Sequence, residues 1–469
     1  MLEIYLVCAP GLENLLGAEA KALGLRVRAI EPGGVTVDGE LSDVVRANIG
    51  LRTASRVLVR IATFKATAFH ELERSARRVA WDRFIGAAPV RIRATCRKSK
   101  LYHSDAVAER VLGAIERATG TGASAGAAPV PPRPAAKAKT GKGARSSGGD
   151  ARSFIPASAN VAAKTVAARA AAKQSIAVAA AKAAVRVADE AAARAAKANA
   201  SAADADGDAH DEADEGTGAQ LVIVRLFRDE CTISIDSSGA LLHRRGYRLA
   251  TAKAPLRETL AAAMLLGAEW TGDTALVDPL CGAGTIPIEA AMIARRIAPG
   301  RMRAEREDFA VAGWPELPPG EIARQAADAR GNELPRARVP IVGSDRDAGA
   351  IEAATANAER AGVSADVSFV RRALSAAEPV GGVPGLLVAN PPYGLRLNDG
   401  ADVRNIYAQL GKVAHFGFPG WRVGVLSPDR ALDSQTRLPL RPSFETSNGG
   451  IRVRYLIGTS EAASEPDVE

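Results

Sequence analysis

Short apolar runs alternate with longer amphipathic stretches along residues 220–460, and this alternation limits the fold more than any other feature of the sequence. Runs such as TALVDPL, VPIVGSD and GLLVAN have the length and composition of buried strands, and a stretch with helical periodicity follows each of them. Strands that alternate with helices typically form a parallel sheet with helices on both faces. The alternation therefore predicts a doubly wound α/β domain, ending in a hairpin with its turn at 448–450.

Residues 1–120 also alternate between predicted strands and helices, but the composition changes abruptly behind them. Between residues 121 and 218, 37 of the 98 residues are alanine and aromatic residues are almost absent. Such a segment cannot bury enough apolar surface to order itself. We therefore expect a mostly disordered insert, either a plain spacer or a basic segment that binds nucleic acid loosely, and a disordered tail at 461–469. Order is expected to resume at Gln220 with two strands and a turn at 237–239.

The net charge of +8 is unevenly distributed along the chain. Residues 1–120 hold 19 Lys and Arg against 13 Asp and Glu, the insert holds 13 against 10, and residues 219–469 hold 29 against 30. The positive charge thus belongs to the front half and the insert, which favours a polyanionic partner held there. An ordinary basic surface is the alternative on charge alone.

Several classes of protein are disfavoured by what the sequence lacks. It contains no run of 18 apolar residues, so no membrane span is expected. The start has no basic region before its apolar run, which disfavours a signal peptide. The four cysteines are far apart and show no metal-ligand spacing, so neither a metal site nor a disulfide framework is expected. A reducing, cytoplasmic setting fits best.

Two of the predicted strands end in carboxylates. The first ends in VDPLCGAGTIPIEAA, where Asp278 precedes a loop whose Gly282 and Gly284 let the backbone approach a ligand closely. The dinucleotide pattern GxGxxG fails because Pro287 takes the third glycine position, and no P-loop lysine motif is present, which disfavours a nicotinamide or phosphate ligand. The second strand ends at Asp345, which is placed to accept hydrogen bonds from ribose hydroxyls. A helix N-cap is an equally good explanation of that aspartate alone.

A third predicted strand runs into Asn390-Pro391-Pro392-Tyr393. Neither proline has an N–H for the strand ladder, so the strand must stop at Asn390. Ligands of doubly wound sheets bind at the carboxyl ends of the strands. Together the three strand ends fit S-adenosylmethionine, with its methyl group aimed at Asn390; a turn that merely ends the strand is the alternative.

These motifs resemble those of class I methyltransferases that act on exocyclic amines. The stretches HRRGYR, APLRETLAAAML and ATCRKSKLYHSDAVAERV resemble THUMP-domain RNA methyltransferases, above all the bacterial 23S rRNA guanine-N2-methyltransferase group. The resemblance covers nearly the whole chain except the insert. It implies a ferredoxin-like unit at 1–50, a THUMP RNA-binding domain at 51–248 interrupted by the insert at 121–218, and a Rossmann-like methyltransferase domain at 249–460.

The resemblance also implies the activity and the roles of site residues. The enzyme would use S-adenosylmethionine to methylate the N2 amine of a guanosine, most plausibly in rRNA and alternatively in tRNA. Asn390 and the backbone of Pro391 would hold the amine, and Tyr393 would stack on the base. The cofactor would lie on Asp278, Gly282, Gly284 and Asp345. Many relatives carry an acid where this chain has Arg371-Arg372, so no adenine contact is named.

Basic residues next to an aromatic residue suit contacts with RNA phosphates and bases. The residues expected to bind RNA are Arg91, Arg93, Arg97, Lys98, Lys100 and Tyr102, followed by Arg244, Arg245 and Arg248. A solvated surface is the alternative.

The same NPPY motif also serves adenine-N6 and glutamine methylation, and a non-catalytic RNA-binding assembly factor is a further alternative. The sequence leaves the oligomeric state open.

Overall fold

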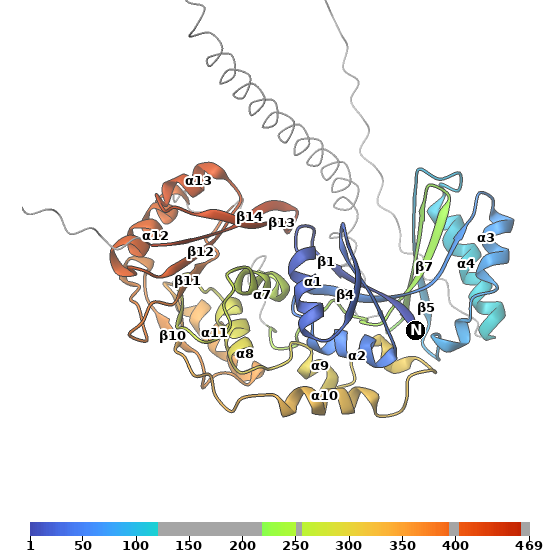
Figure 1. Ribbon diagram of the computed structural model, residues 1–469, viewed down its shortest axis with the longest axis horizontal. Helices are drawn as coiled ribbons and strands as arrows, with labels where there is room; N and C mark the ends of the chain where they lie inside the picture. Colours follow the sequence, from blue (N-terminus) through green and yellow to red (C-terminus); the bar gives the residue numbers. More distant parts are fainter. Residues whose placement is uncertain (121–217, 250–255, 394–402, 461–469) are drawn as a thin grey trace, which may run out of the picture. The chain divides into compact units, whose positions relative to one another are not determined.

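The computed structural model describes residues 1–120, 218–249, 256–393 and 403–460 (Figure 1). The predictions for the insert and for the tail at 461–469 lie outside these residues. Among the described helices, none is both long enough and apolar enough to cross a membrane.

The first of two seven-stranded sheets has the strand order β2-β3-β1-β4-β7-β6-β5. Its neighbouring strands are antiparallel except for the parallel pair β5 and β6. The strands are β1 (Leu2–Cys8), β2 (Arg26–Glu31), β3 (Gly34–Gly39), β4 (Ala54–Lys65), β5 (Val90–Arg97), β6 (Gln220–Phe227) and β7 (Glu230–Asp236). The helices packed on it are α1 (Glu13–Ala22), α2 (Leu41–Gly50), α3 (Phe69–Ala76) and α4 (Ser104–Thr119), with a short 3-10 helix η1 (Trp81–Arg83).

The pairing register explains why this sheet holds together across the insert. Ile4 lies opposite Val59, Val59 opposite Ile235, and Ile235 opposite Val222. All four side chains are fully buried. Because alternate residues of a strand point to opposite faces, this register forms one apolar face from strands on both sides of the insert.

The second sheet has the order β10-β9-β8-β11-β12-β14-β13 and confirms the predicted doubly wound domain. The neighbouring strands β10, β9, β8, β11 and β12 are parallel to one another. Strands β14 and β13 extend the sheet as an antiparallel hairpin. The strands are β8 (Leu276–Asp278), β9 (Ile341–Asp345), β10 (Ser368–Arg371), β11 (Leu386–Ala389), β12 (Arg422–Ser427), β13 (Arg441–Asn448) and β14 (Ile451–Thr459). The helices are α7 (Glu258–Gly267), α8 (Thr285–Ala294), α11 (Ala348–Ala361), α12 (Val403–Gly417) and α13 (Arg430–Gln435), with the 3-10 helix η4 (Leu374–Ala376).

Strand β11 shows how an uninterrupted apolar run packs on two faces. Leu386 and Val388 belong to the apolar cluster that includes α7 and α8, whereas Leu387 and Ala389 belong to the cluster that includes α12. Consecutive strand residues point to opposite faces, so a strand buried on both sides must be apolar throughout. The strand order reverses between β8 and β11, and the carboxyl ends of these two neighbours form the crevice where such folds bind ligands.

Two local features differ from the sequence predictions. The hairpin of β6 and β7 turns at Arg228 and Asp229, which both have positive φ (53° and 63°), and not at 237–239. No glycine marks this turn, and of its two residues only Asp229 is of a type common in turns. Ser237 and Ser238 instead follow β7, and both hydroxyls form hydrogen bonds with the Asn48 side chain.

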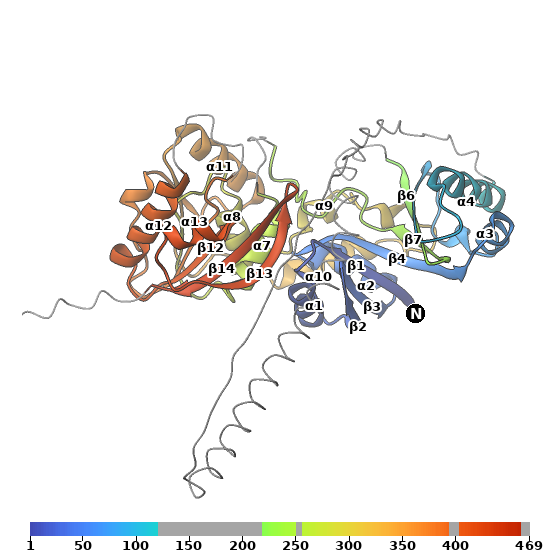
Figure 2. The same cartoon turned by 90° about the horizontal axis from the view of Figure 1, so that it is seen from above.

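The segment between α8 and β9 was assigned no structure from the sequence. It forms α9 (Arg301–Glu305), the 3-10 helix η3 (Ala310–Gly313) and α10 (Glu321–Gly331), and α10 packs against α2 (Figure 2). The Trp314 indole N–H donates to the Gln220 side chain at 2.8 Å, and Gly300 N–H donates to the Ile49 carbonyl at 2.9 Å. This segment therefore bonds the helix layer of the second sheet to the first sheet.

Candidate active site

Three strand ends meet at one edge of the second sheet. Asp278 is the last residue of β8, Asp345 is the last residue of β9, and Asn390 directly follows β11. These strands are parallel neighbours, with Asp278 opposite Gly343 and Leu387 opposite Val277. The fold thus brings together the predicted cofactor residues and the predicted amine-holding residue, which are far apart in the sequence.

The loop after β8 is fixed by hydrogen bonds to the end of β9. Gly282 N–H donates to Asp345 Oδ2 at 3.1 Å, and Cys281 N–H donates to the Ser344 carbonyl at 3.0 Å. The second carboxylate oxygen of Asp345 accepts from Asp347 N–H at 3.0 Å. Each carboxylate oxygen has two lone pairs, so Asp345 still has acceptor capacity for a ligand.

The two loop glycines have different surroundings. Both have positive φ, 52° at Gly282 and 84° at Gly284. A Cβ on Gly284 would lie 2.9 Å from the Ala354 methyl group and from the Phe369 ring, whereas one on Gly282 would meet no described atom within 4 Å. Gly284 is therefore required for packing, and Gly282 leaves open space on the loop where a ligand can approach the backbone.

Asp278 is buried, with 1 % of its surface exposed, and its Oδ1 accepts from Leu280 N–H at 3.1 Å. The pKa of this carboxyl is raised to about 8, chiefly by burial and also by the nearby charge of Asp345, although the Leu280 hydrogen bond opposes the shift. A cationic ligand group next to Asp278 would favour its ionised form.

Asn390 presents a buried acceptor to this edge. Its side-chain oxygen Oδ1 is buried and has no hydrogen-bond partner among the described residues. Buried polar atoms almost always have partners, because an unpaired one costs about 1–3 kcal/mol. The following Pro391 is also buried and gives the backbone no N–H at this point. The segment from Asn390 to Pro391, called the Asn390 corner below, thus has an acceptor without a hydrogen-bond donor. A bound amine could supply that donor.

Tyr393 has a different environment from the open stacking face that was expected. Its side chain is only 1 % exposed, and its hydroxyl accepts a hydrogen bond from Asn448 Nδ2 at 2.6 Å. The ring packs in the apolar cluster that includes α7 and α8. Stacking on a base stays a prediction, and it requires this ring to become accessible.

The predicted RNA-binding residues fall into two groups. Arg91, Arg93 and Arg97 are partly exposed on the edge strand β5, where their spacing of two and four residues places them on one face. Lys98, Lys100 and Tyr102 are exposed in the loop that follows, and Tyr102 is 70 % exposed.

The HRRGYR stretch forms the second group, and only part of it is accessible. Arg244 is exposed, but Arg245 is 2 % exposed and donates to the carbonyls of Leu242 and Arg52 at 2.6 Å each. Arg248 is 13 % exposed and pairs with Glu258 at 2.9 Å. The RNA contact predicted for Arg245 stays a prediction, and it requires this buried guanidinium to become accessible. The residue types alone do not distinguish these positions.

One network near the loop was missed from the sequence. Asn357 Nδ2 donates to the Ala283 carbonyl at 3.0 Å, between the two loop glycines. Arg360 donates to the Asn357 side chain and, at 2.6 Å, to the Tyr247 carbonyl. The Tyr247 hydroxyl in turn donates to Glu289 at 3.1 Å. Asn357 and Arg360 lie three residues apart on α11, a spacing common to any exposed helix, so no sequence signal marked them.

Cys281 is the thiol closest in sequence to the loop glycines. Burial raises the pKa of the Cys281 thiol, so it is not an activated nucleophile. Across the described residues, no three His, Cys, Asp or Glu side chains are arranged to hold a metal ion.

The strand order, the glycine loop and the Asn390 corner define a Rossmann-like methyltransferase fold. Residues 245–455 match the family model described as an RMKL-like methyltransferase domain, and residues 3–58 match that of the RlmL ferredoxin-like domain. The chain therefore combines a ferredoxin-like N-terminal domain with a methyltransferase domain, and the match implies S-adenosylmethionine as the cofactor.

Individual relatives agree with these domain matches. The chain is 29 % identical to the ribosomal RNA large subunit methyltransferase K/L of Syntrophotalea carbinolica, over 97 % of this chain and 53 % of that protein, so it spans about half of that relative. A solved possible methylase from Clostridium difficile 630 is 25 % identical, with a TM-score of 0.69 over 99 % of both chains. A predicted N6-adenine-specific DNA methylase from Listeria monocytogenes is 26 % identical, with a TM-score of 0.68 over 98 % of this chain and 96 % of that one.

Proposed function

We propose that this protein transfers a methyl group from S-adenosylmethionine to the N2 amine of a guanosine in large-subunit rRNA. The observation that carries the proposal is the buried Asn390 Oδ1 without a described partner, at the sheet edge where the strand order reverses. The similarity to a large-subunit rRNA methyltransferase supports RNA as the substrate class. A tRNA guanosine is the closest alternative substrate.

The cofactor would bind on the loop after β8. Gly282 supplies the open backbone face, Asp345 offers its remaining lone pairs to ribose hydroxyls, and Asp278 faces a cationic group of the ligand. When bound, S-adenosylmethionine supplies an electrophilic methyl group on a sulfonium. Gly284 would contribute its backbone, and its lack of a Cβ also lets the loop lie close to Ala354.

The amine would be held by two acceptors. Its lone pair is delocalised into the guanine ring, so the enzyme must orient the amine and favour its pyramidal form. The Asn390 Oδ1 and the carbonyl of Pro391 would each accept one amine hydrogen, which directs the lone pair at the methyl group. Orientation and electrostatics would supply the rate enhancement without a strong base.

RNA would be captured by the edge of the first sheet. The loop after β5 is fixed to the β6–β7 turn, because Lys100 N–H donates to Asp229 Oδ1 at 2.7 Å and Asp229 N–H donates to Ser99 Oγ at 3.0 Å. This holds Lys98, Lys100 and the exposed Tyr102 in a fixed arrangement, which suits phosphate contacts and base stacking. We assign this region, within 51–248, to a THUMP domain, and we assign the reaction to the cytoplasm.

Adenine-N6 methylation is the second candidate. It is favoured by the similarity to the predicted N6-adenine-specific DNA methylase, and an adenine amine could occupy the same Asn390 corner. The basic edge of the first sheet and the rRNA methyltransferase relative weigh against it. A non-catalytic assembly factor is disfavoured by the intact glycine loop.

The test is transfer of radiolabelled methyl from S-adenosylmethionine to unmodified large-subunit rRNA, to tRNA and to DNA, followed by nucleoside chromatography. Asn390→Ala is compared with Asn332→Ala, which removes a similar side chain from the exposed end of α10. We expect N2-methylguanosine in rRNA with wild type and Asn332→Ala, and at least a hundredfold less with Asn390→Ala. Label only in tRNA would change the substrate, and N6-methyladenine would replace the proposal with the second candidate.

A further inference from the structure

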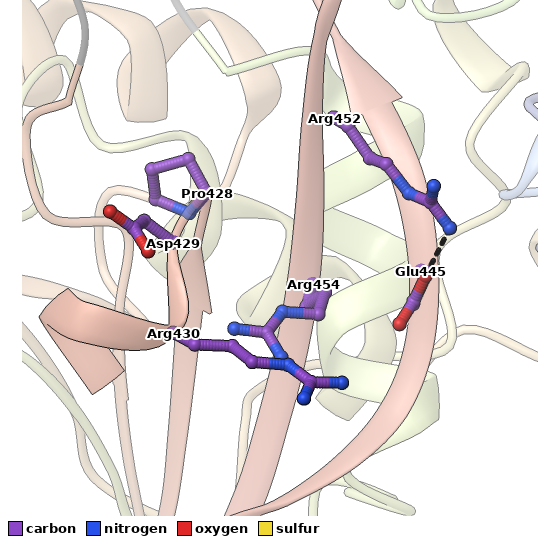
Figure 3. Close-up of a pocket in the computed structure, with 6 residues that line it drawn as sticks. All are labelled: Pro428, Asp429, Arg430, Glu445, Arg452 and Arg454. Atoms are coloured by element: carbon purple, nitrogen blue, oxygen red, sulfur yellow. Dashed lines mark hydrogen bonds and ion pairs between the residues drawn. The ribbon is translucent and has the colours of Figure 1, made fainter. Parts of the chain in front are cut away.

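An arginine-lined groove lies at the end of the second sheet, beside the proposed active site. It has a volume of about 430 Å³. Its lining residues are Pro428, Asp429 and Arg430 after β12, with Glu445, Arg452 and Arg454 from the terminal hairpin (Figure 3). The volume is within the range of sites that hold nucleotide-sized ligands.

The three guanidinium groups differ in how they are paired. Arg454 is 12 % exposed and pairs with Asp433 of α13. Arg452 is 75 % exposed and pairs with Glu445 at 2.6 Å. Arg430 is exposed and makes no ion pair with any residue that the structure describes. Figure 3 shows Arg430 and Arg454 reaching into the same space, with the Asp429 carboxylate set apart from them.

This arrangement favours an anion in the groove. Two guanidinium groups that share one space repel each other, and an anion between them removes that repulsion. Arginine presents five N–H donors, so a residue with one carboxylate partner still has donors for a phosphate. The Arg452–Glu445 pair is exposed and therefore worth little, so a phosphate could join or displace it easily.

The register places the groove at the same edge as Asn390. Ala389 of β11 lies opposite Val425 of β12, so Asn390 is level with Leu426, one residue before Ser427. Ser427 in turn lies opposite Arg454 of β14. Neighbouring strands are about 4.8 Å apart, so β14 lies roughly 10 Å from β11. If the target nucleotide of a polymer is held at Asn390, a neighbouring nucleotide of the same strand would lie at the groove.

We propose that this groove binds a backbone phosphate of the RNA strand next to the target nucleotide, with Arg430 and Arg454 as the principal donors. The inference rests on the proposed function and adds a substrate contact that is separate from the first sheet. The groove contributes to holding the strand while the target base occupies the Asn390 corner. None of its lining residues belongs to the cofactor loop after β8.

The test compares Arg430→Ala and Arg430→Glu with Arg441→Ala. Arg441 is an exposed residue at the other end of the same hairpin, where it pairs with Ile457. Its substitution by alanine removes the same positive charge, but at a position away from the groove. The probe is unmodified large-subunit rRNA, and its affinity is measured over a range of salt concentrations. Loss of one phosphate contact should lower the slope of log affinity against log salt by about 0.7–0.9.

We expect Arg430→Ala to weaken RNA binding about three- to tenfold with that loss of slope, and Arg430→Glu to weaken it more. Arg441→Ala should match wild type, and all variants should bind S-adenosylmethionine equally by calorimetry. Equal RNA affinity and slope in the Arg430 and Arg441 variants would overturn the proposal. Guanosine monophosphate binding that is lost in Arg430→Glu while RNA binding persists would assign the groove to a free nucleotide instead. Failure of wild type to methylate any RNA would contradict the proposed function separately.

Discussion

The Tyr393 hydroxyl accepts a 2.6 Å hydrogen bond from the side-chain amide of Asn448, which joins the segment after β11 to the last residue of β13. Both side chains are buried. The corner that contains Asn390 is therefore attached to the terminal hairpin, which also carries two of the groove arginines. One hydrogen bond thus links the Asn390 corner to the hairpin that would contact the substrate.

This bond should be measurable by a double-mutant cycle. Asn448→Ala and Tyr393→Phe each remove one partner, and we expect a coupling free energy of about 0.5–1.5 kcal/mol in urea unfolding. We also expect Asn448→Ala to lower the methyl transfer rate several-fold while S-adenosylmethionine affinity stays unchanged, because only the amine corner is released. Strict additivity of the two substitutions would contradict a direct interaction.

Cofactor binding should depend on pH through Asp278. Its pKa is raised to about 8, chiefly by burial, so the carboxyl is largely protonated at neutral pH without ligand. A cationic ligand favours the ionised form, so affinity should rise by up to tenfold per pH unit below pH 8 and level off above it. Calorimetry in buffers of different ionisation enthalpy should detect the released proton, and Asp278→Asn should abolish both effects. A flat profile in the wild type would show that no cationic group approaches this carboxyl.

The Asp278 carboxyl should also make the free energy of unfolding depend on pH, in the opposite direction to cofactor affinity. Its ordinary pKa of about 3.9 applies in the unfolded chain, so the unfolded state loses this proton first as pH rises. Asp278 therefore destabilises the ligand-free fold increasingly between about pH 4 and pH 8. Relative to wild type, Asp278→Asn should gain stability over this interval, as measured by urea unfolding at several pH values. A constant difference between the two proteins would argue against the raised pKa.

The two loop glycines should respond differently to alanine. In Gly284→Ala, the new methyl group meets Ala354 and Phe369 at 2.9 Å, and φ is 84°, so we expect a loss of about 2–4 kcal/mol in unfolding free energy. Gly282→Ala meets no described atom and should cost only about 1–2 kcal/mol for its left-handed backbone. It should nevertheless weaken S-adenosylmethionine binding at least tenfold, because the methyl group occupies the open side of the loop. The reverse ranking in stability would be inconsistent with the packing described.

Asn357 should act as a positioning residue for the cofactor loop. Asn357→Ala removes the 3.0 Å bond to the Ala283 carbonyl, so the loop should become less ordered and the cofactor dissociation constant should rise about three- to tenfold. RNA affinity should not change, because the Asn357 side chain is fully buried and cannot touch the RNA. A matched control is Thr355→Ala, an exposed residue of the same helix whose hydroxyl bonds only within the helix. Equal cofactor affinity in both variants would exclude the positioning role.

The sequence predicted the alternation of strands and helices, the three strand ends at Asp278, Asp345 and Asn390, and the basic character of the front half. These features follow from local patterns. Apolar runs with period two or 3.6 reveal the elements, and prolines or glycines mark where the elements end. Residues at the ends of parallel strands must then meet at one edge, so the grouping of these three positions was predictable.

Which polar residues are accessible follows from the packing of the folded chain and was not predictable from the sequence. Arg244 and Arg245 are adjacent and chemically identical, yet one is exposed and the other is buried, with a hydrogen bond to the carbonyl of Arg52, which lies 193 residues away. The same holds for Tyr393, whose partner Asn448 lies 55 residues away. The arginine groove also combines residues from the start of α13 with residues from both strands of the terminal hairpin. Burial and pairing depend on long-range packing, which the local sequence pattern does not record.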